Sequence, residues 1–234
     1  MIFNAEKFDQ FKKKQYLCGG FVQKLFCVQK LLNRTTIIDK HARDMRKTEV
    51  FITFYLLQEK TNLSKNIRQM ATDLGLSIGS VHNALQHLQV EGFLIEDNDK
   101  RILRKRAQLI DLWAKAYAAL KPKYLLCRFT FLNQHVRDQW QNIVLPETLS
   151  WGGEPAAALH DRFLFPERWD VYAADNANGL IATGRMIPNQ QGEIYVYKRF
   201  WQTDATPLIV VYADLLALND YRCQEVAERL KPLI

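Results

Sequence analysis

The side chains with the clearest chemical task lie between residues 66 and 94, in the stretch NIRQMATDLGLSIGSVHNALQHLQVEGFL. One face of a helix expected there carries short or polar side chains, most of them uncharged: Ser80, His82, Asn83, Gln86 and His87. Asn and Gln read base edges in the major groove of DNA through paired hydrogen bonds, and a helix that lies in the groove needs such a face. The chemistry that these residues offer is therefore base recognition.

Two expected helices must hold this polar face in place. Their apolar residues recur at helical spacing, with Ile67, Met70, Ala71 and Leu74 in the first helix and Val81, Ala84, Leu85 and Leu88 in the second. Gly75 tolerates a positive φ, so it can end the first helix and turn the chain. Ser77 is a good N-cap for the second helix. The stretch thus predicts a helix-turn-helix.

A hairpin is expected directly after the second helix, which Gly92 closes. Residues 93–96 and 101–104 have strand character and flank the turn Asp97-Asn98-Asp99-Lys100, so together they predict a wing. The residues expected to contact DNA are Ser77, Ser80, His82, Asn83, Gln86, Lys65, Arg68, Lys100, Arg101 and Arg104. Two helices and a hairpin can also pack as an ordinary subdomain, and some winged helices bind only proteins.

The net charge of +7 is unevenly distributed along the chain. Residues 1–43 hold nine Lys or Arg against three Asp or Glu, a net charge of +6. Residues 44–106 hold ten against eight, and residues 107–234 hold thirteen against fourteen. The basic residues therefore gather on the side of the predicted helix-turn-helix, as attraction to phosphate requires.

Enzyme motifs are absent from the sequence. There is no G-x-x-x-x-G-K-[ST], H-E-x-x-H or G-x-S-x-G pattern, and the five histidines and four cysteines show no ligand spacing. We therefore expect no catalytic residue, no metal site and no cofactor, with the thiols reduced in a cytoplasmic protein. The sequence contains no run of about eighteen apolar residues, so we expect no membrane span.

One segment of the C-terminal half has two features that could serve phosphate chemistry. Gly152 and Gly153 precede an expected helix with Pro155 in its first turn, and a helix N-terminus behind glycines can bind phosphate. Downstream, Trp169-Asp170-Val171-Tyr172 resembles the strand on which nucleotidyltransferases carry two carboxylates for Mg²⁺, but a tyrosine stands at the second position. A tight turn that packs a helix on a sheet is the favoured interpretation, and a nucleotidyltransferase-like enzyme is the least favoured hypothesis.

The whole pattern predicts an α+β protein in which an N-terminal winged helix-turn-helix is joined by a connecting helix to a mixed α/β C-terminal domain. The expected parts are a helical basic segment over 1–43, the DNA-binding domain over 44–106, the connecting helix over 107–123 and the α/β domain over 124–234. Strands are expected at 124–131, 169–173, 193–200 and 208–211, and helices at 44–59, 107–120 and 222–230. Glu154 and Asp214 are expected at helix N-termini, where a carboxylate is stabilising.

Three separated segments carry a family resemblance: LIDLWAKAYAALKPKYLLCRF, WGGEPAAALHDRFLFPERWDVYA and PLIVVYADLLALNDYRCQEVAERL. The residues on which it rests are Trp113, Tyr117, Arg128, Gly152, Gly153, Glu154, Pro155, Ala156, Tyr212, Ala213, Asp214, Leu215 and Asp220. Together they resemble the AbiEi-type antitoxins of abortive-infection, type IV toxin–antitoxin systems. Residues 1–43 are too short for the nuclease-like N-terminal region that often accompanies this pattern, so no role is carried over to them.

The resemblance implies a transcriptional regulator that represses its own operon and neutralises a toxin that is itself a nucleotidyltransferase. The partners it implies are double-stranded operator DNA and such a toxin, and two-fold operators would favour a dimer. It assigns no role to the motif residues Gly152, Gly153, Glu154, Pro155, Tyr212 and Asp214. A protein-binding adaptor or antitoxin that acts through the C-terminal domain without reading DNA is the alternative.

Overall fold

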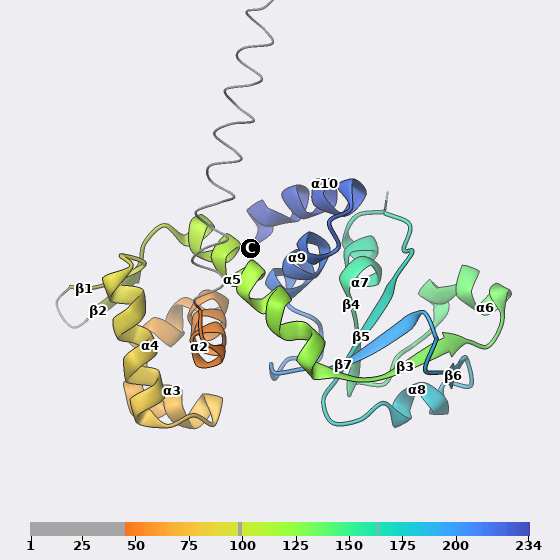
Figure 1. Cartoon of the computed structure of the whole chain (residues 1–234), viewed down its shortest axis with the longest axis horizontal. Coiled ribbons are helices and arrows are strands. Elements are labelled where there is room, and N and C mark those ends of the chain that lie inside the picture. The colour runs from red at the N-terminus through yellow and green to blue at the C-terminus, as the bar shows by residue number, and fades with distance from the viewer. Residues whose placement is uncertain (1–44, 98–99, 163) are drawn as a thin grey trace, which may run out of the picture. The chain divides into compact units, whose positions relative to one another are not determined.

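The computed structural model describes residues 45–97, 100–162 and 164–234. All of these residues lie in the second of two units into which the chain divides, residues 42–234. The helical basic segment expected over 1–43 lies outside the described residues. The second unit contains helices and two sheets, which confirms the prediction of a mixed α and β protein (Figure 1).

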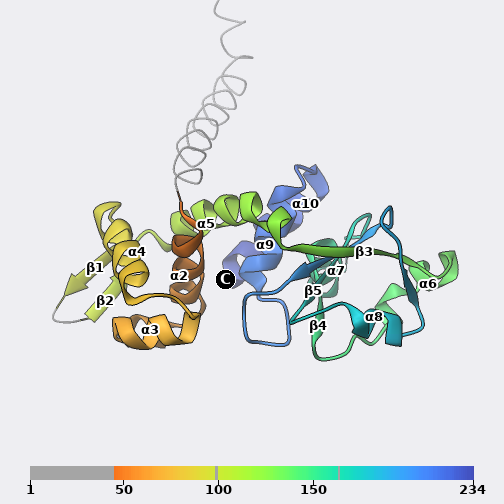
Figure 2. The same cartoon turned by 60° about the horizontal axis from the view of Figure 1, so that its bottom comes forward.

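The first elements of the second unit are four helices and a hairpin (Figure 2). They are α2 (Lys47–Gln58), the short 3₁₀ helix η1 (Lys60–Ser64), α3 (Ile67–Leu74), α4 (Ile78–Val90), β1 (Leu94–Asp97) and β2 (Lys100–Leu103). Buried side chains of α2, among them Ile52 and Leu56, belong to the same core as Val81, Leu85 and Leu88 of α4. Burial of such side chains stabilises each of these short helices, which would be marginal alone.

Local side-chain chemistry fixes the ends of α3 and α4. Asn66 accepts a hydrogen bond from the Gln69 backbone N–H at 2.9 Å, and the Gln69 side chain accepts one from the Asn66 N–H at 3.0 Å. Gly75 has a φ of 61°, which lets the chain turn after α3. The Ser77 Oγ accepts a hydrogen bond from the Ser80 N–H at 3.1 Å and so caps α4.

Helix α5 (Arg106–Leu120) joins the two halves of this unit. The indole Nε1 of Trp113 donates to the carbonyl oxygen of Val50 at 2.8 Å, and its ring stacks on Phe54 and on Tyr117. The other side of α5 packs against α9 (Leu208–Ala217). The expected connecting helix, over residues 107–120, is thus present and is buried between both halves. The 3₁₀ helix η2 (Lys121–Tyr124) follows it.

A five-stranded mixed sheet forms the C-terminal half, in the order β4-β5-β7-β3-β6. The strands are β3 (Leu125–Phe131), β4 (Leu149–Gly152), β5 (Trp169–Ala173), β6 (Met186–Pro188) and β7 (Ile194–Lys198). Strands β5 and β7 run parallel, and every other neighbouring pair is antiparallel. The sequence predicts β3, β5 and β7 but misses β4 and β6, which are short edge strands.

The remaining helices complete this half of the unit (Figure 1). They are α6 (Gln134–Asp138), η3 (Trp140–Asn142), α7 (Gly153–His160), α8 (Asn178–Ala182), α10 (Tyr221–Leu230) and η4 (Lys231–Leu233). Helix α9 packs against α5, α7 and α10. The strand predicted at 208–211 is wrong, because these residues form the first turn of α9. A helix that is apolar all round has the same short apolar run as a buried strand.

The expected position of Asp214 is also wrong. The residue lies inside α9 and is buried, so it does not cap a following helix. Glu154 does lie in the first turn of α7, as expected.

Candidate functional site

The polar face of α4 is open to solvent. His82, Asn83, Gln86 and His87 are exposed, and Ser80 is partly exposed. The Ser80 hydroxyl shares a hydrogen bond with the Ser77 hydroxyl at 2.8 Å. Within the described part of the chain, the side chains of Asn83 and Gln86 make no hydrogen bond, so their amide groups are available to a partner.

A hollow of about 480 Å³ lies beside this face, between α4 and the start of α2. Asn83, Gln86 and His87 line it together with Arg46 and Glu49. Glu49 is buried and accepts a hydrogen bond from the Arg46 N–H at 3.0 Å. Its Oε2 also lies 3.6 Å from the His87 Nδ1, close enough to form an ion pair when the imidazole is protonated.

Lys65 is held by an ion pair. Its Nζ lies 2.8 Å from the Asp73 Oδ2, and Tyr55 donates a hydrogen bond to the same carboxylate. The hydrogen bond to Asp73 raises the pKa of Lys65, as does the one to Tyr55. Both members of the Lys65–Asp73 pair have about 38% of their side-chain surface exposed, so water weakens their attraction. Arg68 is exposed, and its side chain has no hydrogen bond within the described residues.

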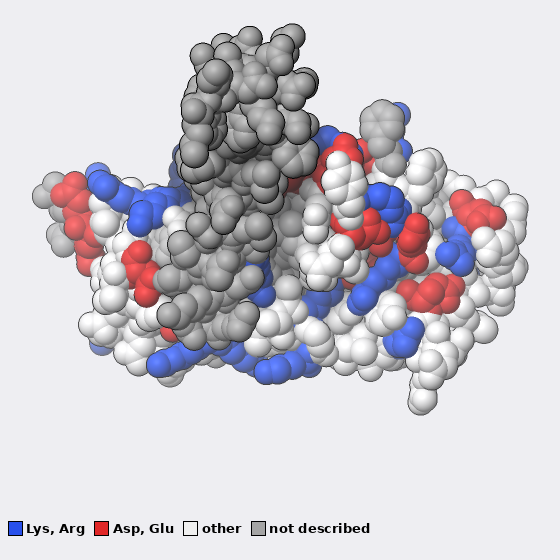
Figure 3. Space-filling model, turned by 45° about the horizontal axis from the view of Figure 1, so that its top comes forward, with Lys and Arg blue, Asp and Glu red and all other residues white. Residues whose placement is uncertain are grey.

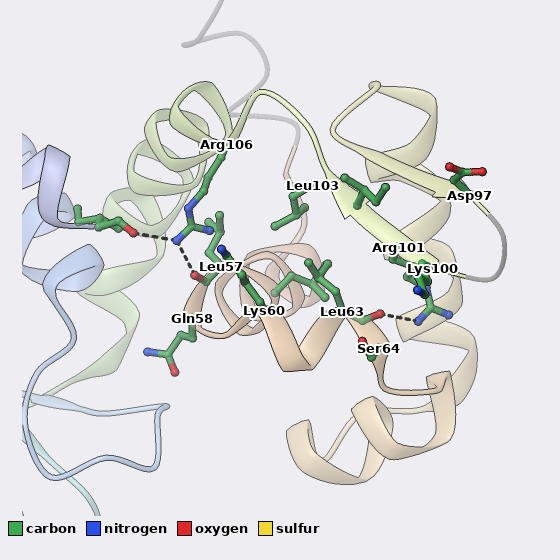
Figure 4. Close-up of a pocket in the computed structure, with 13 residues that line it drawn as sticks. Leu57, Gln58, Lys60, Leu63, Ser64, Asp97, Lys100, Arg101, Leu103 and Arg106 are labelled. Atoms are coloured by element: carbon green, nitrogen blue, oxygen red, sulfur yellow. Dashed lines mark hydrogen bonds between the residues drawn. The ribbon is translucent and has the colours of Figure 1, made fainter.

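The cationic side chains in and after the β1–β2 hairpin differ in exposure and in hydrogen bonding. The Arg101 Nη1 donates to the Lys65 carbonyl oxygen at 2.7 Å and to the Leu63 carbonyl oxygen at 3.4 Å, and so braces the hairpin against η1 and the start of α3. Figure 4 shows the bond to Leu63. Lys100 and Arg104 are exposed. In the strand register Arg101 faces Glu96 and Lys100 faces Asp97, so acidic side chains offset part of the charge of the hairpin. Acidic and basic side chains are likewise interspersed on the face seen in Figure 3.

A cavity of about 800 Å³ lies at the base of the hairpin. Apolar side chains of α2 and η1 form part of its lining, with Lys60, Lys100 and Arg106 among the polar residues (Figure 4). The Arg106 Nη2 donates to the carbonyl oxygens of Leu57 at 2.8 Å and Ile234 at 2.9 Å. These two bonds tie the exit of the hairpin to α2 and to the last residue of the chain.

The glycine pair of the C-terminal half forms a close junction between β4 and α7. A Cβ atom on Gly152 would lie 2.4 Å from the Tyr172 Cε2, so only glycine fits beneath that ring. Gly153 has a φ of 49°, and its N–H donates to the Asp214 Oδ2 at 3.0 Å. The favoured interpretation of a tight turn packed on a sheet agrees with these contacts.

A buried charged cluster lies under this junction. The Lys121 Nζ lies 2.6 Å from the Asp170 Oδ2 and 2.6 Å from the Asp214 Oδ1. The exposed fraction of the side chain is 8% for Lys121, 3% for Asp170 and 0% for Asp214. We call Lys121, Asp170 and Asp214 the lysine–aspartate cluster. Sequence reasoning missed Lys121 and found Asp170 and Asp214 only separately, because the three residues come from distant positions.

Neighbouring groups saturate the cluster with hydrogen bonds. Arg168 Nε donates to the second oxygen of Asp170 at 3.0 Å, and the Tyr172 hydroxyl donates to Asp214 at 2.8 Å. The Tyr117 hydroxyl lies 2.7 Å from that of Tyr172. Burial acts to lower the pKa of Lys121, but the two carboxylates outweigh it and raise the pKa.

Burial dominates the pKa values of the other groups around the cluster. It raises the pKa of the Asp214 carboxyl although Lys121 opposes the shift. It also raises the pKa of Tyr172 and of Tyr117 well above the usual range, and the charge of Asp214 adds to both shifts. The two tyrosines therefore remain hydrogen-bond donors near neutral pH.

The other motif residues also make internal contacts. Glu154 accepts a hydrogen bond from the Glu167 N–H at 2.9 Å, and burial raises the pKa of its carboxyl. The Tyr212 hydroxyl donates to the Asp111 Oδ1 at 2.6 Å, which joins α9 to α5. Pro155 is buried in the first turn of α7. The family motif is therefore a set of packing and hydrogen-bond contacts in the described structure.

Among residues 45–97, 100–162 and 164–234, no three His, Cys, Asp or Glu side chains lie together as metal ligands would. No helix in the same ranges combines the length and the apolar character that a bilayer crossing requires.

Comparison with known proteins gives one family. Residues 101–233 match the family described as transcriptional regulator, AbiEi antitoxin, type IV toxin–antitoxin system. No curated protein and no solved structure matches the chain significantly.

Proposed function

Because the chain belongs to the AbiEi antitoxin family of type IV toxin–antitoxin systems, we propose that it is a sequence-specific DNA-binding regulator that represses its own operon. The family description supports a role as regulator and antitoxin. Binding to an operator and autorepression are the finer claims of this proposal. We propose further that the chain has no enzymatic activity of its own.

The observation that carries the proposal is the open polar face of α4. Asn83 and Gln86 present amide groups that have no hydrogen bond to any other described residue, from a helix whose opposite side is anchored in the core. The order of α2, α3, α4 and the hairpin supports the assignment of a winged helix-turn-helix over residues 44–106. In such a unit the second helix of the helix-turn-helix enters the major groove and the hairpin lies along the backbone.

The proposed contacts divide by chemistry. Ser77, Ser80, His82, Asn83 and Gln86 would face bases or nearby sugars, and Lys65, Arg68, Lys100, Arg101 and Arg104 would face phosphates. Arg68, Lys100 and Arg104 are the best placed of the cations, because their side chains are exposed. Lys65 would have to share its ammonium with Asp73, and Arg101 would contribute mainly by holding the hairpin in place.

Equilibrium binding to two duplexes tests the proposal. Fluorescence anisotropy would compare the DNA upstream of the gene itself with a scrambled duplex of equal length, at several salt concentrations. We expect tighter binding to the upstream duplex and a Kd that rises steeply with salt. The Gln86→Ala variant should lose preference, whereas Gln224→Ala, an exposed glutamine on α10, should not. Equal affinity of the parent chain for both duplexes would reject operator recognition.

A second candidate function rests on where the family match lies. It covers residues 101–233 and does not include α3 or α4. The C-terminal domain, over residues 124–234, would then be an antitoxin or adaptor module that binds a nucleotidyltransferase toxin. Co-expression of the full chain with the neighbouring gene product tests this function. A complex that survives Asn83→Ala and Gln86→Ala together would support it, and free toxin at micromolar concentrations of both proteins would reject it.

A further inference from the structure

The lysine–aspartate cluster has the geometry of an occupied cation site. One oxygen of each carboxylate converges on the Lys121 Nζ, at 2.6 Å in both cases. Hard divalent cations take oxygen ligands at about 2.0–2.6 Å, so an ion at the position of the Nζ would need only a small approach of the two oxygens to bind both. The ammonium stands at the point where such an ion would stand.

The outer contacts of the carboxylates strengthen this comparison. The second oxygen of Asp170 accepts from Arg168, and the second oxygen of Asp214 accepts from the Gly153 N–H. Carboxylates that bind metals are held by outer hydrogen bonds of this kind, which fix their orientation. Two carboxylates are balanced here by the charges of Lys121 and Arg168. The four groups therefore need no further cation.

The surroundings of the cluster include the Gly152–Gly153 pair and the strand of Asp170 and Tyr172, which resembles a metal-binding strand of nucleotidyltransferases. Asp170 lies on β5, next to the glycine pair between β4 and α7, and Gly153 touches it: a Cβ there would lie 3.0 Å from the Asp170 Oδ2. Tyr172 occupies the position where a second strand carboxylate would hold metal, and its hydroxyl donates to Asp214 on α9. The Lys121 Nζ also lies 4.6 Å from the centre of the Tyr197 ring, a cation–π distance.

We propose that Lys121 is a built-in replacement for a divalent cation, and that removing its ammonium opens a site for Mn²⁺ or Mg²⁺ between Asp170 and Asp214. The tethered ammonium neutralises the carboxylates permanently, so the C-terminal domain folds without metal. It also occupies the position that metal-assisted nucleotidyl transfer would need. This inference does not depend on DNA binding by α4.

Metal binding to a Lys121→Ala variant of the full chain tests the proposal. The truncated side chain leaves space for an ion and its water ligands. We expect Mn²⁺ to raise the Tm of this variant in a saturable manner, by about 5–10 °C at a hundred times its Kd. The parent chain should show no such shift. Lys123→Ala, which removes an exposed lysine two residues away, should behave as the parent chain does.

A second substitution tests whether Mn²⁺ binds between Asp170 and Asp214. Adding Asp214→Asn to Lys121→Ala should abolish the response to Mn²⁺, because only one carboxylate remains. If Lys121→Ala folds and its Tm is independent of Mn²⁺ and Mg²⁺, or if Asp214→Asn leaves the response intact, the proposal is wrong.

Folding itself provides the readout if Lys121→Ala is insoluble. Refolding with Mn²⁺ should then recover a cooperative thermal transition, and refolding with a chelator should not. Failure under both conditions would overturn the proposal, provided that Lys121→Met combined with Asp170→Asn and Asp214→Asn folds. Incorporation of labelled nucleotide by the parent chain in the presence of Mg²⁺ would contradict it as well.

Discussion

The two halves of the described unit differ in where their charged side chains lie: mainly at the surface around α4, and buried in a cluster in the C-terminal half. Around α3, α4 and the hairpin, Arg68, Lys100 and Arg104 are exposed. The Lys65–Asp73 ion pair also has about 38% of each side chain in solvent. In the C-terminal half, Lys121 meets two carboxylates at positions that solvent hardly reaches. Exposed charge contributes little to stability and remains available to a polyanion, whereas buried charge must be paired in place.

This contrast assigns different consequences to substitutions of the same chemical type. Changes near α4 should alter binding and leave the fold intact. Changes around the lysine–aspartate cluster should lower the free energy of unfolding. Three experiments of decreasing expected effect test the contrast.

The largest effect is expected for Lys121→Met. The substitution keeps most of the side-chain volume but leaves two buried carboxylates facing each other without a cation. Breaking a buried pair by removing one partner costs about 3–5 kcal/mol of unfolding free energy. Urea denaturation in the presence of a chelator measures the loss. Lys123→Met is the matched exposed control and should leave the midpoint unchanged. A loss below about 1 kcal/mol, the range of surface ion pairs, would show that the buried cluster contributes no more to stability than exposed charges do.

Two glycine-to-alanine substitutions, one in each half, should change the free energy of unfolding by an intermediate amount and in opposite directions. In Gly152→Ala the new Cβ would collide with the Tyr172 ring, which hydrogen bonds hold in place, so we expect a loss of about 1–3 kcal/mol. In Gly79→Ala, on α4, the Cβ would meet nothing within 4 Å, and the higher helix propensity of alanine should add up to about 1 kcal/mol. Thermal unfolding of both variants measures the difference. Destabilisation by Gly79→Ala would show that α4 has less space than described.

The smallest effect on the protein itself is expected for Lys100→Ala on the hairpin. Its side chain is exposed, so the Tm should not change. Loss of one phosphate contact should weaken binding to all duplexes about equally and reduce the slope of log K against log salt by about 1. Anisotropy titrations at four salt concentrations measure that slope. An unchanged slope would remove Lys100 from the proposed interface.

Local patterns were enough to predict much of the helical structure. The apolar stripe of α5 predicts its extent to within a residue, because a half-buried helix shows its period directly. The N-cap expected at Ser77 is present for the same reason, since the serine and the N–H that it accepts from are only three residues apart. Edge strands β4 and β6 are too short to carry a period of their own.

Local sequence patterns could not predict the buried parts of the C-terminal half. Residues 208–211 are apolar on every side because α9 is enclosed by α5, α7 and α10, and nothing in that run distinguishes a strand from a helix. The partners of Lys121 lie 49 and 93 residues further along the chain. Their contact depends on how η2, β5 and α9 come together, so the motif residues could be recognised but not explained.

In the proposed function α4 reads bases, while the buried charges of the C-terminal half stabilise its fold. The most direct test compares Asn83→Ala with the parent chain on the upstream duplex and on variants of that duplex with single base-pair changes. We predict that Asn83→Ala loses about 1–3 kcal/mol of discrimination at one base pair and keeps the Tm of the parent. If Asn83→Ala binds every duplex as the parent does, α4 is not the recognition helix.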